Sequence, residues 1–212
     1  MKRAVLTPER LREAARALAE RDPDLALILD RHGPPPLWGR PRGFPTLVQI
    51  ILEQQVSLAS ARAILKRLVE AVGEPTPERL IAAGEERLRG CGLTRQKAAY
   101  CRGLAAAALD GRLDLAEVAR LDDAAAIEAL TRHDGIGPWT AQVYLLMSLR
   151  RPDVWPAGDL GLIVSMRTVK RLRRPPSRDR ALAIAERWRP YRSVAARMLW
   201  QDYLARRAVV VP

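Results

Sequence analysis

The residue types that could carry out chemistry in this chain gather between His133 and Leu162. Gly135 and Gly137 allow positive φ angles and let another molecule approach the backbone closely. A helix expected to begin at Pro138 would point unpaired backbone amides out of this turn, and its dipole would add partial positive charge. The turn therefore predicts a site that binds a phosphate group through the backbone, with no side chain reading a base.

A single carboxylate, Asp159, follows the turn by about twenty residues and stands after a Pro156-Ala157-Gly158 loop. An aspartate at this position can cap the next helix, which would hold its carboxylate rigidly. Taken alone, the aspartate is compatible with a simple helix cap. The glycine turn alone is likewise compatible with an ordinary connection between two antiparallel helices.

The elements that must position these residues are predicted to be helices, because apolar residues recur at spacings of three and four almost throughout. The fold class is therefore all-α. Thr7-Pro8-Glu9 and Thr76-Pro77-Glu78 each place a capping hydroxyl before a proline at the first helical position. Further helices are expected at Phe44–Gln54, Ser57–Val72, Thr94–Leu109, Asp122–Arg132, Pro138–Leu149, Asp159–Leu172, Ser177–Trp188 and Pro190–Arg206, about ten in all.

Two helical lobes are the simplest partition of these elements. The Pro- and Gly-rich stretch from Gly33 to Pro45 predicts a stiff linker, and Arg173-Arg174-Pro175-Pro176 predicts a joint between helices. Residues 44–150 would form one lobe with the glycine turn, and residues 1–43 plus 151–212 the other. The one stretch with strand character is the short Val209-Val210-Val211 tail.

The charge of the chain predicts a polyanionic partner. The formal net charge is +12, and residues 150–212 hold fifteen Lys or Arg against five Asp or Glu, which is +10 of that total. Nucleic acid is the simplest partner and an anionic membrane the alternative, although a merely solvated arginine-rich face would give the same composition. No uncharged run reaches the roughly 18 residues that a membrane span needs, and the stretch Met1–Leu6 is too short for a signal peptide, which indicates a cytoplasmic protein. It is also expected to associate with a bacterial or archaeal nucleoid.

Cysteine usage limits the possible prosthetic groups. Cys91 and Cys101 are ten residues apart and are the two cysteines of the chain. They can build neither a disulfide framework nor a site of four cysteines for a metal or an iron–sulfur cluster. Both are predicted to be small core residues.

Four segments resemble a known family in the right order: Phe44–Ser57, Gly92–Ala98, Gly135–Ala141 with Val154–Gly161, and Trp188–Ala196. The third is similar to the hairpin and catalytic segment of the helix-hairpin-helix DNA glycosylase superfamily, in its AlkA-type 3-methyladenine DNA glycosylase II branch. The resemblance covers roughly residues 44–203. It implies two helical lobes with the active-site cleft between them, and excision of alkylated purines from double-stranded DNA.

By this resemblance Asp159 is the catalytic carboxylate. Cleavage of an N-glycosidic bond builds oxocarbenium character on the sugar, which a fixed anion stabilises, and the same group can orient the attacking water. A base made cationic by alkylation leaves without a general acid, so no second carboxylate is needed. Asp153 is accordingly expected to be a surface residue.

Excision also requires that the damaged base leave the DNA double helix, which costs a few kcal/mol. A wedge residue that fills the space left by the base and an aromatic pocket that binds it must offset this cost. The resemblance implies that Trp139, Trp200 and Tyr144 line the base pocket, where π-faces suit electron-poor alkylated purines. It also implies that Gln55, with Gln54 beside it, fills the vacated stack. The other three tryptophans, Trp38, Trp155 and Trp188, are expected in the core.

The resemblance further implies backbone sites in the hairpin: phosphate-binding amides at Gly135, Gly137 and Thr140, and a Na⁺ or K⁺ ion on carbonyls of Thr131, His133 and Ile136. No organic cofactor and no iron–sulfur cluster are expected. Arg192 is expected to bind a DNA phosphate, and Arg197 is a second candidate.

Trp139 separates two mechanisms. Relatives that cut the strand carry at its position a lysine that forms a Schiff base, which a tryptophan cannot do. We therefore expect a monofunctional enzyme that leaves an abasic site. It is also expected to be a monomer.

The chain departs from the family pattern at three positions, and these departures leave its substrate range open. Gly158 replaces a residue that is often acidic, while Val143 and Leu160 replace aromatic residues of some relatives. Other possibilities are a glycosylase for mismatched or oxidised bases, a non-catalytic DNA-binding module and, least favoured, a helical protein of a membrane surface.

Overall fold

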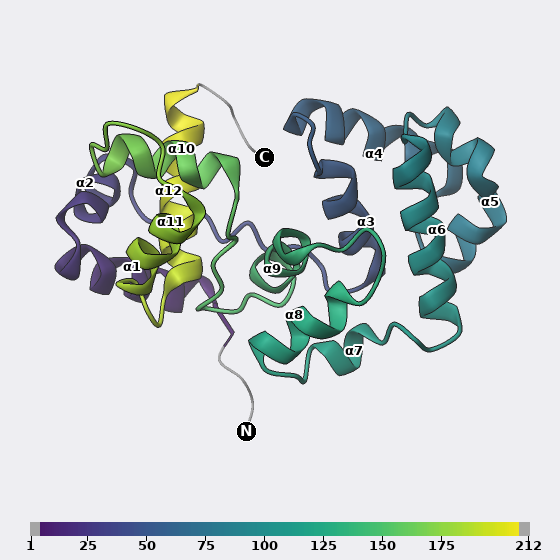
Figure 1. Ribbon diagram of the computed structural model, residues 1–212, viewed down its shortest axis with the longest axis horizontal. Helices are drawn as coiled ribbons and strands as arrows, with labels where there is room; N and C mark the ends of the chain where they lie inside the picture. Colours follow the sequence, from purple (N-terminus) through teal and green to yellow (C-terminus); the bar gives the residue numbers. More distant parts are fainter. Residues whose placement is uncertain (1–4, 208–212) are drawn as a thin grey trace. The chain divides into compact units, whose positions relative to one another are not determined.

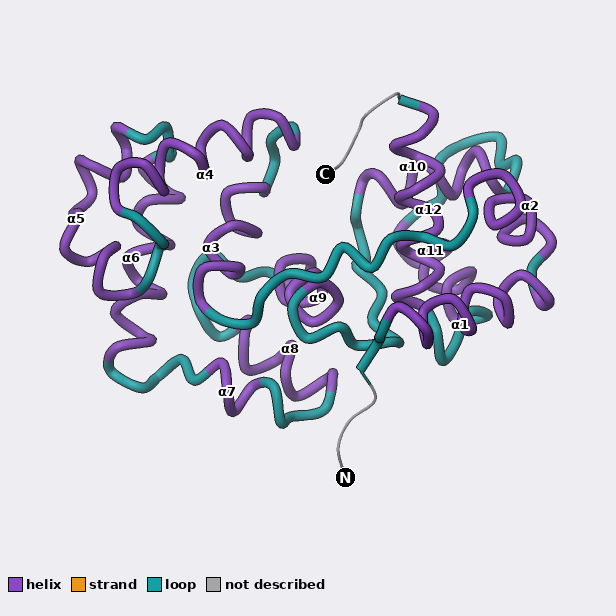
Figure 2. Tube along the Cα trace, turned by 180° about the vertical axis from the view of Figure 1, so that it is seen from behind, coloured by secondary structure: helices purple, strands orange, loops and turns teal. Residues whose placement is uncertain are grey.

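The computed structural model describes residues 5–207, and every regular element within that range is a helix (Figures 1 and 2). This confirms the all-α prediction for the described part; the Val209-Val210-Val211 tail lies outside it. The helices are α1 (Pro8–Arg21), α2 (Pro23–His32), α3 (Phe44–Glu53), α4 (Leu58–Val72), α5 (Pro77–Gly90), α6 (Arg95–Leu109), α7 (Leu115–Val118), α8 (Asp123–Thr131), α9 (Pro138–Met147), α10 (Leu160–Val169), α11 (Arg178–Glu186) and α12 (Arg192–Arg206).

The predicted start signals begin helices where the sequence indicated. The hydroxyl oxygens of Thr7 and Thr76 accept hydrogen bonds from the amides of Arg10 and Arg79, so α1 and α5 begin at the prolines that follow. Side-chain caps also start α4, α6, α8 and α11, at residues 57, 94, 122 and 177. These oxygens satisfy amides that a helix N-terminus leaves unpaired.

The count of about ten helices was too low, because two starts were not recognised. Asp22 caps α2 ahead of Pro23, and Asp114 caps the short α7. Helix α12 begins at Arg192, two residues later than expected, after a cis bond at Pro190. Gly84, at φ 70°, kinks α5.

The chain divides into two compact units, one of Met1–Gly39 with Leu145–Pro212 and one of Arg40–Tyr144. The sequence placed these boundaries at residues 44 and 150. The second boundary falls inside α9, whose last turn belongs with the C-terminal helices. Within the described residues, no helix is long and apolar enough to cross a membrane.

In the Arg40–Tyr144 unit, α3 supplies the centre of the core. Leu47, Ile50 and Ile51 are fully buried, and α3 packs against α4 and α6. Both cysteines are buried, as predicted for small core residues, and burial raises the pKa of the Cys101 thiol to about 12. The core of α3 thus sets the position of the connection that leaves its C-terminus.

In the other unit, α12 packs against α1, α2, α10 and α11 (Figure 1). A buried ion pair joins the end of α10 to the start of α2: Lys170 Nζ lies 2.6 Å from Asp22 Oδ1 and 3.0 Å from Asp24 Oδ2. The indole of Trp188 donates to Asp22 Oδ2 at 2.7 Å. Trp188 and Trp155 are core residues, as expected, with ring centroids 5.5 Å apart.

Asp22 makes the stability of this unit depend on pH. Burial alone would raise the pKa of Asp22, but the Lys170 and Trp188 hydrogen bonds and the Lys170 charge lower it overall. A lowered pKa in the folded state means that the carboxylate adds stability above its unfolded pKa of about 3.9. This stability is lost as the pH falls through the folded pKa.

Asp22→Asn should lower the free energy of unfolding by about 1–3 kcal/mol at pH 7, because Lys170 loses a buried charged partner. Urea unfolding at pH 7 and at pH 3 would check this, with Asp30→Asn, at an exposed position of the helix that Asp22 caps, as the control. The difference in the free energy of unfolding between wild type and Asp22→Asn should be smaller at pH 3 than at pH 7. A gap of unchanged size at both pH values would contradict the assignment.

Candidate functional site

The glycine turn lies between α8 and α9 and depends on Gly135. Its φ is +86°, and a Cβ built there would lie 2.5 Å from Cγ of the Tyr100 ring. Ile136 is buried beside it and anchors the turn from inside. Only glycine fits a position with both a left-handed backbone and a ring this close. The hairpin predicted from Gly-Ile-Gly is therefore built on tight packing against α6.

Gly137 differs from Gly135, because its surroundings are open. It is exposed, and a Cβ built there would meet nothing within 4 Å. Gly137 and Thr140 contribute amides to the first turn of α9, where a helix leaves amides without intrahelical acceptors. The dipole of α9 adds partial positive charge at this open surface, so the arrangement can hold an anion such as a phosphate.

The predicted cation ligands, Thr131, His133 and Ile136, span the end of α8 and the turn. The last carbonyls of a helix lack intrahelical partners, and such oxygens are ligands for hard cations. The His133 carbonyl accepts the Ile136 amide at 3.1 Å, which leaves its second lone pair available. The donor chemistry therefore fits a monovalent cation.

Burial, and next the Arg112 charge, lower the pKa of the His133 ring, so it is neutral at pH 7.

The predicted wedge residues follow α3, and the structure gives them different surroundings. Gln55 is exposed and has a φ of 56°, a conformation that costs free energy in any residue but glycine. Gln54 is half-buried, and its amide donates to Gly135 O and to Thr140 Oγ1, both at 2.9 Å. The expectation of a wedge role for Gln54 is corrected, because its side chain binds the hairpin.

Asp159 is the N-cap of α10, as the sequence indicated. Its Oδ1 accepts the Leu162 amide at 2.9 Å, and the chain enters through a turn in which the Asp159 amide donates to Pro156 O at 3.1 Å. Gly158 has a φ of +87° at the third position of this turn, a conformation that glycine adopts without steric cost. The glycine that departs from the family pattern thus has a backbone role.

Trp200, on α12, holds the same carboxylate. Its indole N–H donates to Asp159 Oδ1 at 3.0 Å. A Cβ built on Gly161 would lie 3.2 Å from Asp159 Oδ1 and 3.5 Å from Trp200 Cδ1, so a glycine lets α10 approach α12 here. Two donors on one oxygen fix the carboxylate in place. The sequence predicted a pocket role for Trp200 and missed this contact, for which no local pattern exists.

Trp200→Phe should slow excision by about tenfold, because it keeps an aromatic ring and removes one hydrogen bond to a charged group, worth about 1.5 kcal/mol. Duplex binding should stay close to wild type. Single-turnover excision and fluorescence anisotropy would measure the two quantities. Trp155→Phe, in the core, is the matched control. Excision at the wild-type rate would show that the indole N–H does not position Asp159.

The other two predicted pocket residues lie on α9. Trp139 is half-buried at the second position of the helix. Tyr144 is fully buried, and its hydroxyl accepts the Gly43 amide at 3.3 Å. The expectation that Tyr144 lines a base pocket is corrected, because a ring without exposed surface offers no face to a base. Val143 is likewise a core residue, whereas Leu160 is 74% exposed.

The two arginines expected to bind DNA phosphates form hydrogen bonds and ion pairs within the protein. The Arg192 side chain bonds Asp153 through Nε at 3.0 Å and Glu186 through Nη1 at 2.7 Å. Asp153, expected at the surface, is largely buried by this pairing. Arg197 is fully buried and donates to backbone carbonyls of Leu37, Ser193 and Leu146. The phosphate role is corrected for both, because their guanidinium groups already have partners.

Burial, and next the nearby Arg150 charge, lower the pKa of Arg197 to about 9. This value is above neutral pH, so the guanidinium stays charged at pH 7. Arg197 thus stabilises the packing of α12 as a buried cation bonded to carbonyl oxygens.

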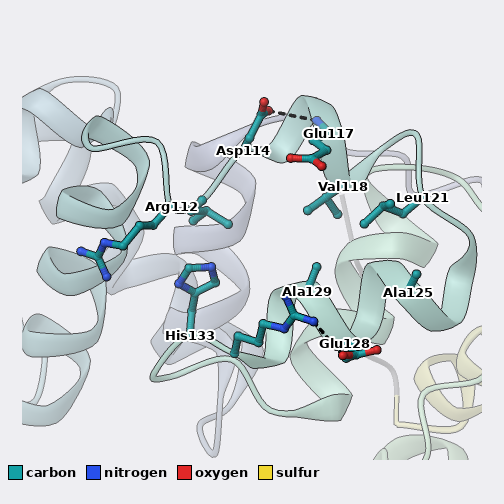
Figure 3. Close-up of a pocket in the computed structure, with 11 residues that line it drawn as sticks. Arg112, Asp114, Glu117, Val118, Leu121, Ala125, Glu128, Ala129 and His133 are labelled. Atoms are coloured by element: carbon teal, nitrogen blue, oxygen red, sulfur yellow. Dashed lines mark hydrogen bonds and ion pairs between the residues drawn. The ribbon is translucent and has the colours of Figure 1, made fainter.

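A hollow of about 400 Å³ lies beside α7 and α8 (Figure 3). Both of its arginines are paired: Arg132 Nη2 lies 2.7 Å from Glu128 Oε1, and Arg112 Nη2 lies 2.7 Å from Asp110 Oδ2. Asp114 is occupied in capping α7. Of the predicted site residues it contains only His133, so it is not the site that the sequence predicted. Within residues 5–207, no three His, Cys, Asp or Glu side chains are grouped to hold a metal ion.

Comparison with known proteins identifies the family of the chain. The family model described as "HhH-GPD superfamily base excision DNA repair protein" matches residues 48–190. DNA-3-methyladenine glycosylase 1 of Schizosaccharomyces pombe is 34% identical over 162 residues, covering 74% of this chain and 71% of that protein. A DNA-3-methyladenine glycosylase of Bacillus subtilis is 31% identical over 175 residues, and the match covers 77% of this chain but 58% of that protein.

Solved structures of glycosylases have a similar fold. The structure of S. pombe 3-methyladenine DNA glycosylase Mag1 in complex with abasic DNA superposes with a TM-score of 0.79 at 30% identity, covering 89% of this chain and 95% of that one. The family model matches most of the chain, and the fold similarity covers nearly all of it. This chain belongs to the HhH-GPD superfamily of base excision DNA repair proteins.

Proposed function

We propose that this protein is a monofunctional DNA glycosylase that removes alkylated purines from double-stranded DNA. The observation that carries the proposal is the carboxylate of Asp159, held at the start of α10 by the Leu162 amide and the Trp200 indole. The 3-methyladenine glycosylases among its relatives support the substrate class.

Asp159 would act on the sugar of the damaged nucleotide. As the N-glycosidic bond lengthens, positive charge develops on the sugar, and a fixed carboxylate stabilises that charge without having to reorganise. The same oxygens can accept a proton from the attacking water and orient it toward the sugar carbon. An alkylated purine already carries positive charge and leaves as a neutral base, so one carboxylate suffices.

The hairpin would bind the DNA backbone. The amides at Gly137 and Thr140 and the dipole of α9 attract a phosphate, and the open surface at Gly137 lets it approach closely. A monovalent cation on the carbonyls of Thr131, His133 and Ile136 would supply further positive charge. Gln55, exposed after α3, would fill the space left by the base.

The absence of strand cleavage is part of the proposal. Lyase chemistry of this kind needs an amine that attacks the sugar and forms a Schiff base. Trp139 carries no amine, so the product would be an intact strand with an abasic site. The protein would act as a monomer, since nothing in this chemistry calls for a second copy.

The test is release of free bases from methylated duplex DNA, with each product strand analysed before and after hot alkali. Release of alkylpurines, with strand breaks only after alkali, is the expected result. Breaks before alkali would contradict the monofunctional mechanism. Tight duplex binding without release of any methylated base would contradict the proposed substrate class.

A further inference from the structure

The connection from α3 to α4, which carries Gln55, is bound to the hairpin by the residue before it. Gln54 Nε2 donates to Gly135 O and to Thr140 Oγ1, each at 2.9 Å. One acceptor lies in the glycine turn, and the other lies in the first turn of α9. The amide of Gln54 therefore bonds both parts of the hairpin whose amides are candidates for phosphate binding.

Lys97, on α6, holds the same connection from the other end. Its Nζ donates to Leu52 O at 2.7 Å and to Gln54 O at 2.8 Å. These carbonyls lie at the C-terminus of α3, where helix carbonyls lack intrahelical partners and where a cation complements the dipole. Burial lowers the pKa of Lys97, consistent with an ammonium group enclosed by neutral backbone acceptors.

Gln55 stands directly after these contacts in a left-handed conformation, at φ 56°. A residue other than glycine keeps such a conformation only where its surroundings enforce it. Here the carbonyl of Gln54 is held by Lys97, and its side chain is held by the hairpin. The strained backbone at Gln55 is thus fixed before any DNA is bound.

We propose that Gln54 and Lys97 are positioning residues that join the wedge to the hairpin, so that phosphate binding at the turn carries Gln55 into the base stack. The proposal rests on the proposed function, because it takes Gln55 as the inserted residue. A free connection would have to be ordered when the base leaves, and this ordering would cost conformational entropy for each residue that is fixed. The hydrogen bonds of Gln54 and Lys97 order the connection in advance, so base extrusion does not bear that cost.

The test separates duplex binding from base extrusion. The wild type, Gln54→Ala, Lys97→Met and Lys97→Arg would be titrated with a duplex that has a tetrahydrofuran abasic analogue and 2-aminopurine opposite it. Anisotropy measures binding, and 2-aminopurine fluorescence reports unstacking without any need for catalysis. Single-turnover excision from methylated duplex measures the chemical step. Circular dichroism at the assay temperature establishes that each variant is folded.

For Gln54→Ala and Lys97→Met we expect binding within about threefold of wild type and both the fluorescence change and the excision rate reduced about tenfold, as a loss of about 1.4 kcal/mol of preorganisation would produce. Lys97→Arg should retain wild-type values, since arginine also donates to both carbonyls. Gln49→Ala on α3 and the exposed Lys66→Met on α4 are the matched controls.

Two outcomes would overturn the proposal. One is an equal loss of binding and fluorescence change in Gln54→Ala, which would indicate a merely structural role. The other is a wild-type fluorescence change in both Gln54→Ala and Lys97→Met. If the wild type excised no base but gave the fluorescence change, the proposed function would fail while the coupling of wedge to hairpin stood.

Discussion

Asp159→Asn should lower the rate of base excision by at least about a hundredfold, while duplex binding stays close to wild type. The substitution isolates charge from geometry. Asparagine is as good an N-cap as aspartate, so α10 should keep its start. The amide oxygen can still accept the Leu162 amide and the Trp200 indole N–H, which both bond Asp159 Oδ1. What is lost is the negative charge that stabilises the developing sugar cation.

The measurement is single-turnover excision from methylated duplex, together with anisotropy on a duplex with a tetrahydrofuran site. Asp114→Asn is the matched control, because Asp114 also caps a helix with its carboxylate, at the start of α7. It should leave excision unchanged. Excision by Asp159→Asn within about threefold of wild type would exclude Asp159 as the group that stabilises the transition state. Loss of binding together with excision would indicate a folding defect.

Gly135→Ala should weaken duplex binding at least about tenfold and destabilise the fold by about 1–3 kcal/mol. Two independent effects add at this position. The φ of +86° is unfavourable for alanine, and the new Cβ would lie 2.5–2.8 Å from atoms of Tyr100. Neither the turn nor the ring can yield without moving the hairpin relative to α6. The amides at the start of α9 would then lose their positions.

Gly137→Ala is the companion variant. Its added methyl group meets nothing within 4 Å, so thermal unfolding should match wild type, and duplex binding should weaken only if the backbone of the DNA approaches there. Adding Tyr100→Ala to Gly135→Ala removes the ring atoms but leaves Cβ of residue 100, 2.7 Å from the new Cβ, together with the strained φ, so the double variant should remain less stable than wild type. Full stability and binding in Gly135→Ala would contradict the packing described for the turn.

Local patterns in the sequence determined the helices and the backbone features of the site. Thr7, Thr76 and Asp159 were recognisable as caps because a cap depends on residues three positions apart. The glycine turn was recognisable for the same reason. Two further helix starts, at Asp22 and Asp114, carry an equally local signal, an aspartate that caps the helix that follows it. The net positive charge and the family motifs also required no knowledge of packing.

Only the tertiary structure decided which side chains meet. It brought Trp200 to Asp159 across 41 residues and Gln54 to Gly135 across 81. It also removed Arg192 and Arg197 from the predicted phosphate contacts, since Arg192 pairs with Asp153, 39 residues away, and Arg197 donates to Leu146 O, 51 residues away. Helix caps and turns arise from hydrogen bonds between near neighbours in sequence, whereas these contacts depend on how whole helices pack, and periodicity does not encode that packing.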